Sequence, residues 1–596
     1  MHYFRPSFTR TSQFISVLTT AALLQACGGG ANPPEDPLVS FKQQHLVWQA
    51  CDSTLIGEGE NAITHLGERA KCALMRAPLD YGNPALGELQ VALSRVTAEQ
   101  PDQREGSILF NPGGPGGDGL IFAPLYAALW SDADPADPTG KLLKEMSNRY
   151  DLIGFSPRGV GSSSSLTCSS PELLEITVDP KFDRSPENLR KELYNARLQA
   201  QACIKNPLSK HIHTDATARD MDLIREVLGD AKLNYIGYSY GTWLGTWYAS
   251  VFPERAGRML FDSSMNVAGS FDDATLLQEV GSYRVLNQIL TPYAARHSGR
   301  FNLGSSAAQV HSALEALPAA IKQEMFDAIS FNQSGRIDSD VLSMTAAVGL
   351  QVLRSRLPNA TPAQFEMAIN TYAFTPGPDN ATAIDIAHEL STKLFTPLQR
   401  VANLTEPHDA VFRAVVCNDM ATSGNESYWI DIGNQYAAQY PMVGGAATYN
   451  PCLYWSAPVT SRPAFAAAAK QVPLLMLQSR YDALTPMEGA EVTLDALPNA
   501  SMIVIEDEYS HGLFPYGLAC VDAKVADYFV NGKMPDRITT CPGTPLPADA
   551  QAAAASSDQP RQGRAKAGTS VYKDEARSQE IMRRIHRKID QATRKF

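Results

Sequence analysis

Ser239 is the residue of this chain whose neighbours best suit it to act as a nucleophile. It lies at the centre of a Gly-Tyr-Ser-Tyr-Gly pentapeptide, residues 237–241. The apolar residues 233–236 predict a strand before it, and residues 242–249 predict a helix after it. On so tight a turn the serine takes strained backbone angles that expose its hydroxyl, and only small residues fit two positions to either side. The pattern predicts a nucleophile elbow.

A serine hydroxyl attacks near neutral pH only when a histidine takes its proton and a carboxylate orients that histidine. His511 is our candidate for the base, because it follows the predicted strand 503–505 and precedes a glycine. Two aspartates compete as the acid: Asp262 ends the strand after the elbow helix, and Asp482 follows the predicted strand 472–477. We favour Asp482, since most enzymes with the order Ser, Asp, His use the later strand end.

The negative oxygen formed by the attack needs donors that are already in place. The N–H of Tyr240, directly after the nucleophile, is one expected donor of this oxyanion hole. The second is expected from the glycine-rich residues 111–117, where we choose Gly114. A phosphate-binding loop is the alternative interpretation of these glycines, but no P-loop lysine follows them.

The order of predicted elements indicates the fold that must position these residues. Strands alternate with helices along residues 88–262, which is typical of a parallel sheet. The sequence is then mostly helical over residues 267–465, and the strand pattern returns after it. We therefore predict an α/β-hydrolase core of mostly parallel sheet, residues 45–266 and 466–544, with a large helical cap, residues 267–465, inserted between its parts. Such a cap usually covers the active site and selects substrates.

Both ends of the chain differ from this globular body. Residues 1–27 have a basic start, an apolar stretch too short to span a bilayer, and a Leu-Gln-Ala-Cys sequence that resembles a bacterial lipobox. Cys27 would then carry a lipid and residues 28–44 would be a flexible tether; an ordinary signal peptide is the alternative. Residues 545–596 predict a disordered linker and a basic tail. Isoleucines at i, i+4 spacing would share one helical face there, but we expect a solvated tail that orders only transiently.

Charge and cysteine content restrict the classes of function further. The net charge is -12, although residues 561–596 carry 11 Lys and Arg against 4 Asp and Glu, so the globular body is strongly acidic and nucleic acid is not expected as a partner. Without Cys27, eight cysteines remain, which suggests four disulfides in an exported chain. Eight cysteines allow 105 pairings. We predict the nearest-neighbour pairing, Cys51–Cys72, Cys168–Cys203, Cys417–Cys452 and Cys520–Cys541. No cysteine or histidine cluster predicts a metal site, and no cofactor is expected.

Several stretches together carry a family resemblance. The Pro-Gly-Gly-Pro-Gly sequence at residues 112–116 resembles the His-Gly-Gly-Pro-Gly loop of proline iminopeptidases, with proline in place of histidine. That replacement, residues 156–162, residues 237–242 and the segment 520–541 are together similar to the secreted tripeptidyl aminopeptidases of the prolyl-peptidase clan. The resemblance covers roughly residues 45–545. Mycobacterial envelope lipoprotein proteases and esterases belong to the same group.

The resemblance implies the triad Ser239, Asp482 and His511, with Gly114 and Tyr240 as the oxyanion hole. It also implies an exported serine aminopeptidase that releases short peptides, tripeptides among them, from free N-termini. The lipobox-like sequence would hold it at the periplasmic or extracellular face of the membrane. A carboxylesterase or lipase is the alternative, because ester and amide hydrolysis use the same residues. A non-catalytic envelope-binding lipoprotein is a more remote one.

Two points fall outside the family pattern. Ser156 stands where the family usually has an aspartate before Pro-Arg-Gly, which puts the support of the Arg158 loop in doubt more than the chemistry. An exopeptidase also needs a carboxylate in its cap to bind the α-amino group of the substrate. Asp419, beside Cys417, is our candidate, and a solvated surface aspartate is the alternative.

Overall fold

The computed structural model describes residues 36–51, 65–395, 399–556 and 570–593. The predicted lipobox with Cys27 lies outside the described residues, as do residues 28–35 of the predicted tether, while the rest of the tether contains the short helix α1 (Val39–Lys42). None of the described helices is long and apolar enough to cross a membrane.

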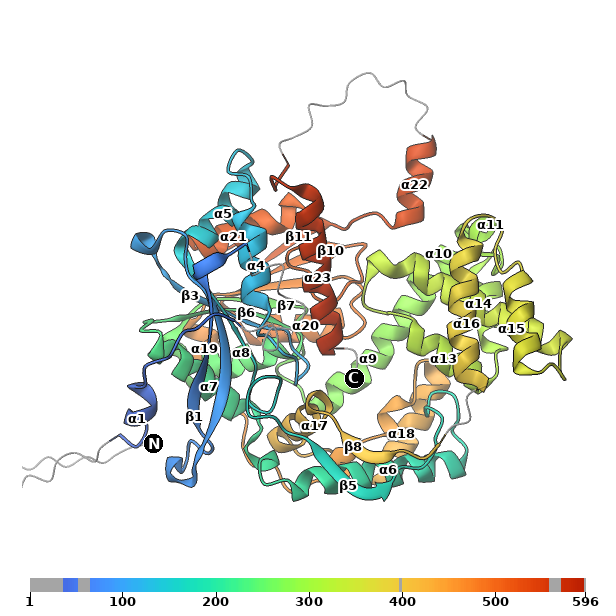
Figure 1. The fold of residues 1–596 in the computed structure, drawn as a ribbon, viewed down its shortest axis with the longest axis horizontal. Coiled ribbons are helices and arrows are strands. Elements are labelled where there is room, and N and C mark those ends of the chain that lie inside the picture. The colour runs from blue at the N-terminus through green and yellow to red at the C-terminus, as the bar shows by residue number, and fades with distance from the viewer. Residues whose placement is uncertain (1–35, 52–64, 396–398, 557–569, 594–596) are drawn as a thin grey trace, which may run out of the picture.

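A nine-stranded sheet forms the core of the protein, in the order β1-β2-β4-β3-β6-β7-β9-β10-β11 (Figure 1). β1 and β2 are antiparallel, β2 meets β4 antiparallel, and every pairing from β4 to β11 is parallel. This confirms the predicted α/β core of mostly parallel sheet. The strands are β1 (Ala70–Pro78), β2 (Glu88–Val96), β3 (Gly106–Asn111), β4 (Tyr150–Phe155), β6 (Leu233–Tyr238), β7 (Ala256–Asp262), β9 (Leu474–Ser479), β10 (Ala500–Glu506) and β11 (Ile538–Pro542).

Helices cover both faces of this sheet, which is why β3, β4, β6 and β9 are buried along their whole length. One face is covered by α4 (Phe122–Ser131), α5 (Pro138–Arg149), α21 (Ala519–Asn531) and α23 (Glu575–Thr593). The other is covered by α1 (Val39–Lys42), α7 (Thr214–Val227), α8 (Tyr240–Val251), α19 (Ala466–Gln471) and α20 (Met487–Ala496).

A helical cap lies beside the sheet and has an apolar cluster of its own (Figure 1). Its helices are α9 (Phe271–Val285), α10 (Thr291–Arg296), α11 (Ser298–Phe301), α12 (Ala307–Glu315), α13 (Ala319–Ala328), α14 (Ile337–Arg356), α15 (Pro362–Thr371), α16 (Asp379–Phe395), α17 (Pro407–Asp419) and α18 (Glu426–Gln439).

The cap also takes in a segment that precedes the elbow. β5 (Cys168–Leu173) pairs antiparallel with β8 (Ala402–Thr405), and α6 (Pro186–Lys205) packs on both strands. The expected boundary, with everything before residue 267 in the core, therefore misses this segment. The reason is that an isolated short strand and a helix carry no local signal of the layer in which they pack.

Four disulfides join neighbouring cysteines: Cys51–Cys72, Cys168–Cys203, Cys417–Cys452 and Cys520–Cys541. They close loops with sequence separations of 21, 35, 35 and 21 residues. Two of them link consecutive elements, β5 to α6 and α21 to β11. These pairs are the nearest-neighbour pairs along the sequence.

The C-terminal region differs from the expected solvated tail. Helix α22 (Pro547–Ser556) begins where a disordered linker is expected, and α23 forms further along the basic segment. Ile581, Ile585 and Ile589 lie on one face of α23 and are buried against the sheet-covering helix α4 and the loops near it. The helix is stable because this apolar stripe has a core to cover, a condition that no local pattern reveals.

Candidate active site

The nucleophile elbow has the geometry that its sequence predicts. Ser239 stands between β6 and α8 with φ 54° and ψ -123°, a conformation that non-glycine residues seldom adopt. Small residues are required beside it, since a Cβ atom on Gly237 would lie 2.7 Å from the carbonyl oxygen of Gly241. A Cβ atom on Gly241 would lie 2.9 Å from the carbonyl oxygen of Asn111. The elbow therefore brings the serine directly against the strand that carries the glycine-rich loop.

The structure places His511 beside Asp482, and both side chains are buried. His511 Nδ1 lies 2.9 Å from Asp482 Oδ2 and 3.1 Å from Oδ1. The backbone N–H groups of Leu484 and Thr485 donate to Asp482 Oδ1 at 2.9 and 2.8 Å. His511 Nε2 is buried and has no hydrogen-bond partner among the described residues. With Nδ1 held by a carboxylate, the ring presents Nε2 as the atom that can take a proton.

Thr485 adds a side-chain contact to this pair. Its hydroxyl donates to Asp482 Oδ2 at 3.1 Å and lies 3.3 Å from His511 Nδ1. Thr485 also lines the small cavity beside Ser239. The threonine is therefore part of the site itself.

Asp262, the competing acid, has a different position. Its carboxyl group accepts from the backbone N–H of Leu513 at 2.9 and 3.0 Å and from that of Phe514 at 2.7 Å. Next to it, Ser263 Oγ accepts from the N–H of Gly512 at 2.8 Å. Burial raises the pKa of Asp262 to about 7, against the lowering effect of these N–H donors. Asp262 and Ser263 thus hold the loop that follows His511, and sequence order alone did not reveal this role.

The glycine-rich loop lies against the serine. A Cβ atom on Gly113 would lie 2.9 Å from Ser239 Cβ, so only glycine allows this approach. The N–H of Gly113 donates to Asn111 Oδ1 at 3.0 Å, which leaves the N–H of Gly114 as the next candidate along the loop. Tyr240 is the first residue of α8, and the first N–H groups of a helix have no partner within the helix. Tyr240 directly follows Ser239, and Gly114 follows the glycine that packs on it; their role as oxyanion donors stays a prediction.

The residue that departs from the family pattern has a partner of its own. Ser156 Oγ donates to Asp118 Oδ1 at 2.7 Å, so a carboxylate is supplied from the glycine-rich loop segment instead. Arg158 is fully buried and donates to Asp220 at 2.7 and 2.6 Å, and further to three backbone carbonyls. The loop therefore keeps its support despite the missing aspartate.

Asp419 lies behind the site and does not face an open cavity. The side chain is buried and accepts from the N–H of Thr214 at 2.8 Å and from the Thr214 hydroxyl. That hydroxyl lies 2.7 Å from Tyr240 Oη, so Asp419 is connected to the residue after the nucleophile. Burial raises the pKa of Asp419 to about 7. The alternative expectation, a solvated surface aspartate, is wrong.

Other acidic residues face a cavity of about 470 Å³ in the cap, which the sequence pattern did not single out. Its lining includes Asp179, Glu192, Asp272 and Asp409, with Arg413 as the basic residue. Burial raises the pKa of Glu192 to about 7. A cavity lined by this many carboxylates favours a cationic ligand.

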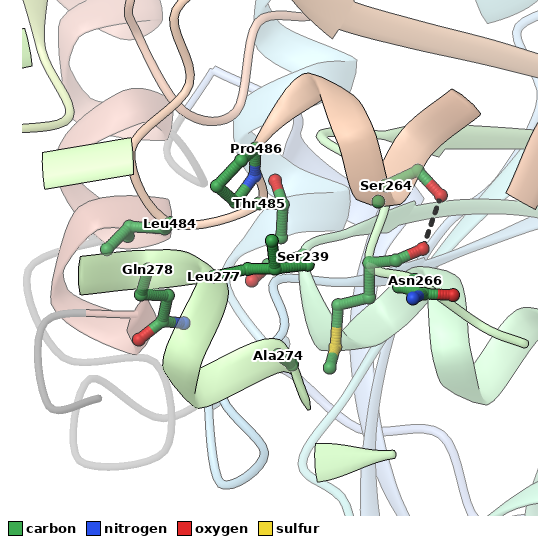
Figure 2. A pocket seen from close by; sticks show the side chains of 11 residues that line it. Ser239, Ser264, Asn266, Ala274, Leu277, Gln278, Leu484, Thr485 and Pro486 are labelled. Atoms are coloured by element: carbon green, nitrogen blue, oxygen red, sulfur yellow. Dashed lines mark hydrogen bonds between the residues drawn. The ribbon is translucent and has the colours of Figure 1, made fainter. Parts of the chain in front are cut away.

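Helix α9 lies between this cap cavity and Ser239. Phe271 and Thr275 of α9 line the cap cavity, while Ala274 and Gln278 line the space beside Ser239 (Figure 2). That space is only about 10 Å³, room for about one water molecule. Ser239 is therefore almost fully buried in this structure.

Comparison with known proteins agrees with the geometry. A family model described as alpha/beta hydrolase fold matches residues 106–342, and one described as TAP-like protein matches residues 440–541. The chain is an α/β-hydrolase. The first matched segment contains the elbow and the start of the cap, the second contains the histidine loop, and residues 343–439 of the cap lie between them.

Curated relatives of this α/β-hydrolase cover most of its length. It is 29% identical over 507 residues to the tripeptidyl aminopeptidase of Streptomyces lividans, covering 81% of this chain and 86% of that protein. It is 26% identical over 539 residues to the serine protease Hip1 of Mycobacterium tuberculosis, with coverages of 88% and 95%. It is 27% identical over 523 residues to carboxylesterase B of the same organism, with coverages of 86% and 92%. The resemblance to tripeptidyl aminopeptidase-like α/β-hydrolases is confirmed, and the protein is a serine hydrolase.

Proposed function

We propose that this serine hydrolase is an exported aminopeptidase that releases short peptides, including tripeptides, from free N-termini. The acidic cavity in the cap is the observation that carries the proposal. An exopeptidase must bind a protonated α-amino group, and carboxylates are the side chains that pair with it. Asp179, Glu192, Asp272 and Asp409 offer such groups one helix away from Ser239. A broad apolar groove without carboxylates would instead favour an acyl ester.

In the proposed mechanism Ser239 Oγ bonds to the scissile carbonyl carbon as its proton passes to His511 Nε2. The N–H groups of Gly114 and Tyr240 stabilise the negative oxygen. His511 then gives the proton to the departing amine, the C–N bond breaks, and an acyl-enzyme remains on Ser239. A water molecule attacks this ester with His511 again as base, and the returned proton restores the serine. Asp482 holds the imidazole and stabilises its charged form.

Glu192 and its acidic neighbours replace Asp419 as the proposed amine anchor. Asp419 is buried and already bound to Thr214, so a substrate amine would have to displace a hydrogen-bonded partner to reach it. Glu192 lines the cap cavity, and a bound ammonium group would favour its charged form. The acidic cavity thus offers carboxyl groups that could bind the α-amino group of the substrate, whereas the carboxyl group of Asp419 is not accessible to it.

We further propose that the protein acts outside the cytoplasm, held to the cell envelope by a lipid on Cys27. Four disulfides support export, because such bonds persist in oxidising compartments. The lipid rests on the lipobox resemblance alone. Replacing Cys27 by serine should move the protein from the membrane fraction to the soluble fraction, and an unchanged distribution would contradict the anchor.

A hydrolysis panel tests the peptidase proposal. Chromogenic tripeptides with free N-termini should be cleaved, while their N-acetylated forms and short- and long-chain esters should be cleaved far more slowly. Ser239→Ala should abolish every activity. Glu192→Gln should raise KM for free tripeptides with little change for esters, since it removes an amine contact and leaves the triad intact. Equal cleavage of acetylated and free peptides would contradict the exopeptidase assignment, and preferred cleavage of esters would favour a carboxylesterase.

A further inference from the structure

The last turn of helix α23 lies directly on the loops of the proposed catalytic centre (Figure 1). A Cβ atom on Gly512, next to His511, would lie 2.6 Å from Ile589 Cγ2. Almost one turn further along, a Cβ atom on Gly117 would lie 2.6 Å from Ala592 Cβ. One on Gly114 would lie 3.3 Å from the carbonyl oxygen of Ala592. α23 therefore covers both the histidine loop and the glycine-rich loop.

The same turn is also held by the cap. His408, on α17, has its Nε2 atom 3.0 Å from the carbonyl oxygen of Ala592. The carbonyl of His408 lies against Gly116 of the glycine-rich loop, where a Cβ atom would approach it to 2.5 Å. The end of α23 is thus enclosed between core and cap, at the place where a substrate must pass to meet the oxyanion donors.

The start of α23 is fixed at a distance from the site. Asp132, which follows α4, accepts from the N–H of Asp574 at 2.9 Å and from Ser578 Oγ at 3.1 Å. Between the two ends, Ile581 and Ile585 are buried in the apolar cluster of the core. The N-terminal part of α23 is therefore anchored near α4, whereas its C-terminal end contacts the histidine loop and the glycine-rich loop through a few residues.

We propose that α23 is an intramolecular inhibitor, and that its last turn must leave the catalytic loops before substrate can reach Ser239. The contacts of Ile589 and Ala592 carry the argument, because they cover the histidine loop and the glycine-rich loop, and Ser239 itself is only 1% exposed. The inference rests on the proposed role of Ser239 as nucleophile. It does not depend on whether the substrate is a peptide or an ester.

The test measures how fast a fluorophosphonate labels Ser239 in the full-length protein, because this probe needs the nucleophile and no particular substrate. Ala592→Glu introduces a longer, charged side chain against Gly117 and should raise the labelling rate at least tenfold. Ala576→Glu, the same substitution at an exposed position of α23, is the matched control and should label at the wild-type rate. His408→Ala is a milder second variant and should raise the rate about fivefold, the weight of one hydrogen bond.

A synthetic peptide of residues 570–596 should slow the labelling of Ala592→Glu again, in a saturable manner. The inference is overturned if Ala592→Glu and His408→Ala both keep the wild-type thermal midpoint and label no faster than the wild type. In that case α23 is a fixed wall of the site. If no variant and no wild-type protein is labelled, the proposed role of Ser239 fails, and that result is distinct from equal labelling of all of them.

Discussion

Replacing Asp262 by asparagine tests which aspartate is the catalytic acid. The structure assigns Asp262 to the loop after His511, through bonds from the N–H groups of Leu513 and Phe514. An asparagine keeps one acceptor oxygen but turns its amide NH₂ group toward a backbone N–H. The loop must then shift, and His511 shifts with it. We expect kcat to fall about 10- to 100-fold, the cost of a displacement of about 1 Å in a catalytic group, with KM almost unchanged.

Two opposing effects set the stability of Asp262→Asn. Raising the pKa of Asp262 from 3.8 to about 7 means that ionising it in the folded protein costs ~4 kcal/mol more than in the unfolded chain. Asparagine removes this cost, but it leaves a buried N–H without an acceptor, which costs about 1–3 kcal/mol. The two effects are of similar size, so we expect a thermal midpoint within a few degrees of the wild type. A loss of activity without a loss of stability would identify a positioning role.

The assay compares Asp262→Asn with Asp482→Asn on the same chromogenic tripeptide across pH 6 to 8. Asp482→Asn should lower kcat on the order of 10⁴-fold, because the imidazole loses the partner that sets its tautomer. The deficit of Asp262→Asn should narrow below pH 7, where the wild-type carboxyl also takes a proton and loses acceptor capacity. If Asp262→Asn costs as much as Asp482→Asn at every pH, the acid has been assigned to the wrong residue.

Three further substitutions test other parts of the site and fold. Thr485→Val should lower kcat about tenfold through the lost bonds to Asp482 and His511, and Thr485→Ser should restore it; equal rates would exclude a role for the hydroxyl. The pKa of Asp419 is raised to about 7 in the folded protein, so between about pH 4 and 7 Asp419 holds a proton that the unfolded chain has lost. The stability of the wild type relative to Asp419→Asn should therefore fall as pH rises from 5 to 7 and level off above pH 7. Denaturant unfolding at several pH values measures this stability difference. A wild type that gains stability relative to Asp419→Asn as pH rises would contradict the raised pKa of Asp419. Replacing Cys520 and Cys541 together by serine opens a bridge of sequence separation 21 and should lower stability by ~3 kcal/mol, while an unchanged unfolding midpoint would show that the bridge contributes little.

Part of the candidate site could be predicted because its signals are local. The glycines around Ser239 are needed because the tight turn leaves room only for small residues. The order of Ser239, Asp482 and His511 follows the order of strands in the sheet. The choice between Asp262 and Asp482 was harder, because both end parallel strands at the same edge. The structure separates them by their partners: one holds the imidazole and the other holds the backbone after it.

Other features could not be predicted, because they depend on which distant segments meet. Asp118 supplies a carboxylate to Ser156 only after the glycine-rich loop and β4 lie side by side. The acidic cap cavity combines Glu192 from before the elbow with Asp272 and Asp409 from after it. Nothing in the neighbourhood of these residues along the chain distinguishes them from solvated surface acids.

Local steric and periodic patterns were therefore sufficient for the elbow, the alternation of strands and helices, and an amphipathic stripe in the basic C-terminal segment. Only the tertiary structure shows which surface that stripe covers, namely the core beside α4. Ala592 meets Gly117 and His408 across large separations in sequence, and these contacts place the end of α23 on the glycine-rich loop. Short-range propensity describes how a segment folds, whereas the burial of one segment against another depends on the whole chain. For that reason five residues were enough to predict the candidate nucleophile, and its burial could not be predicted from them.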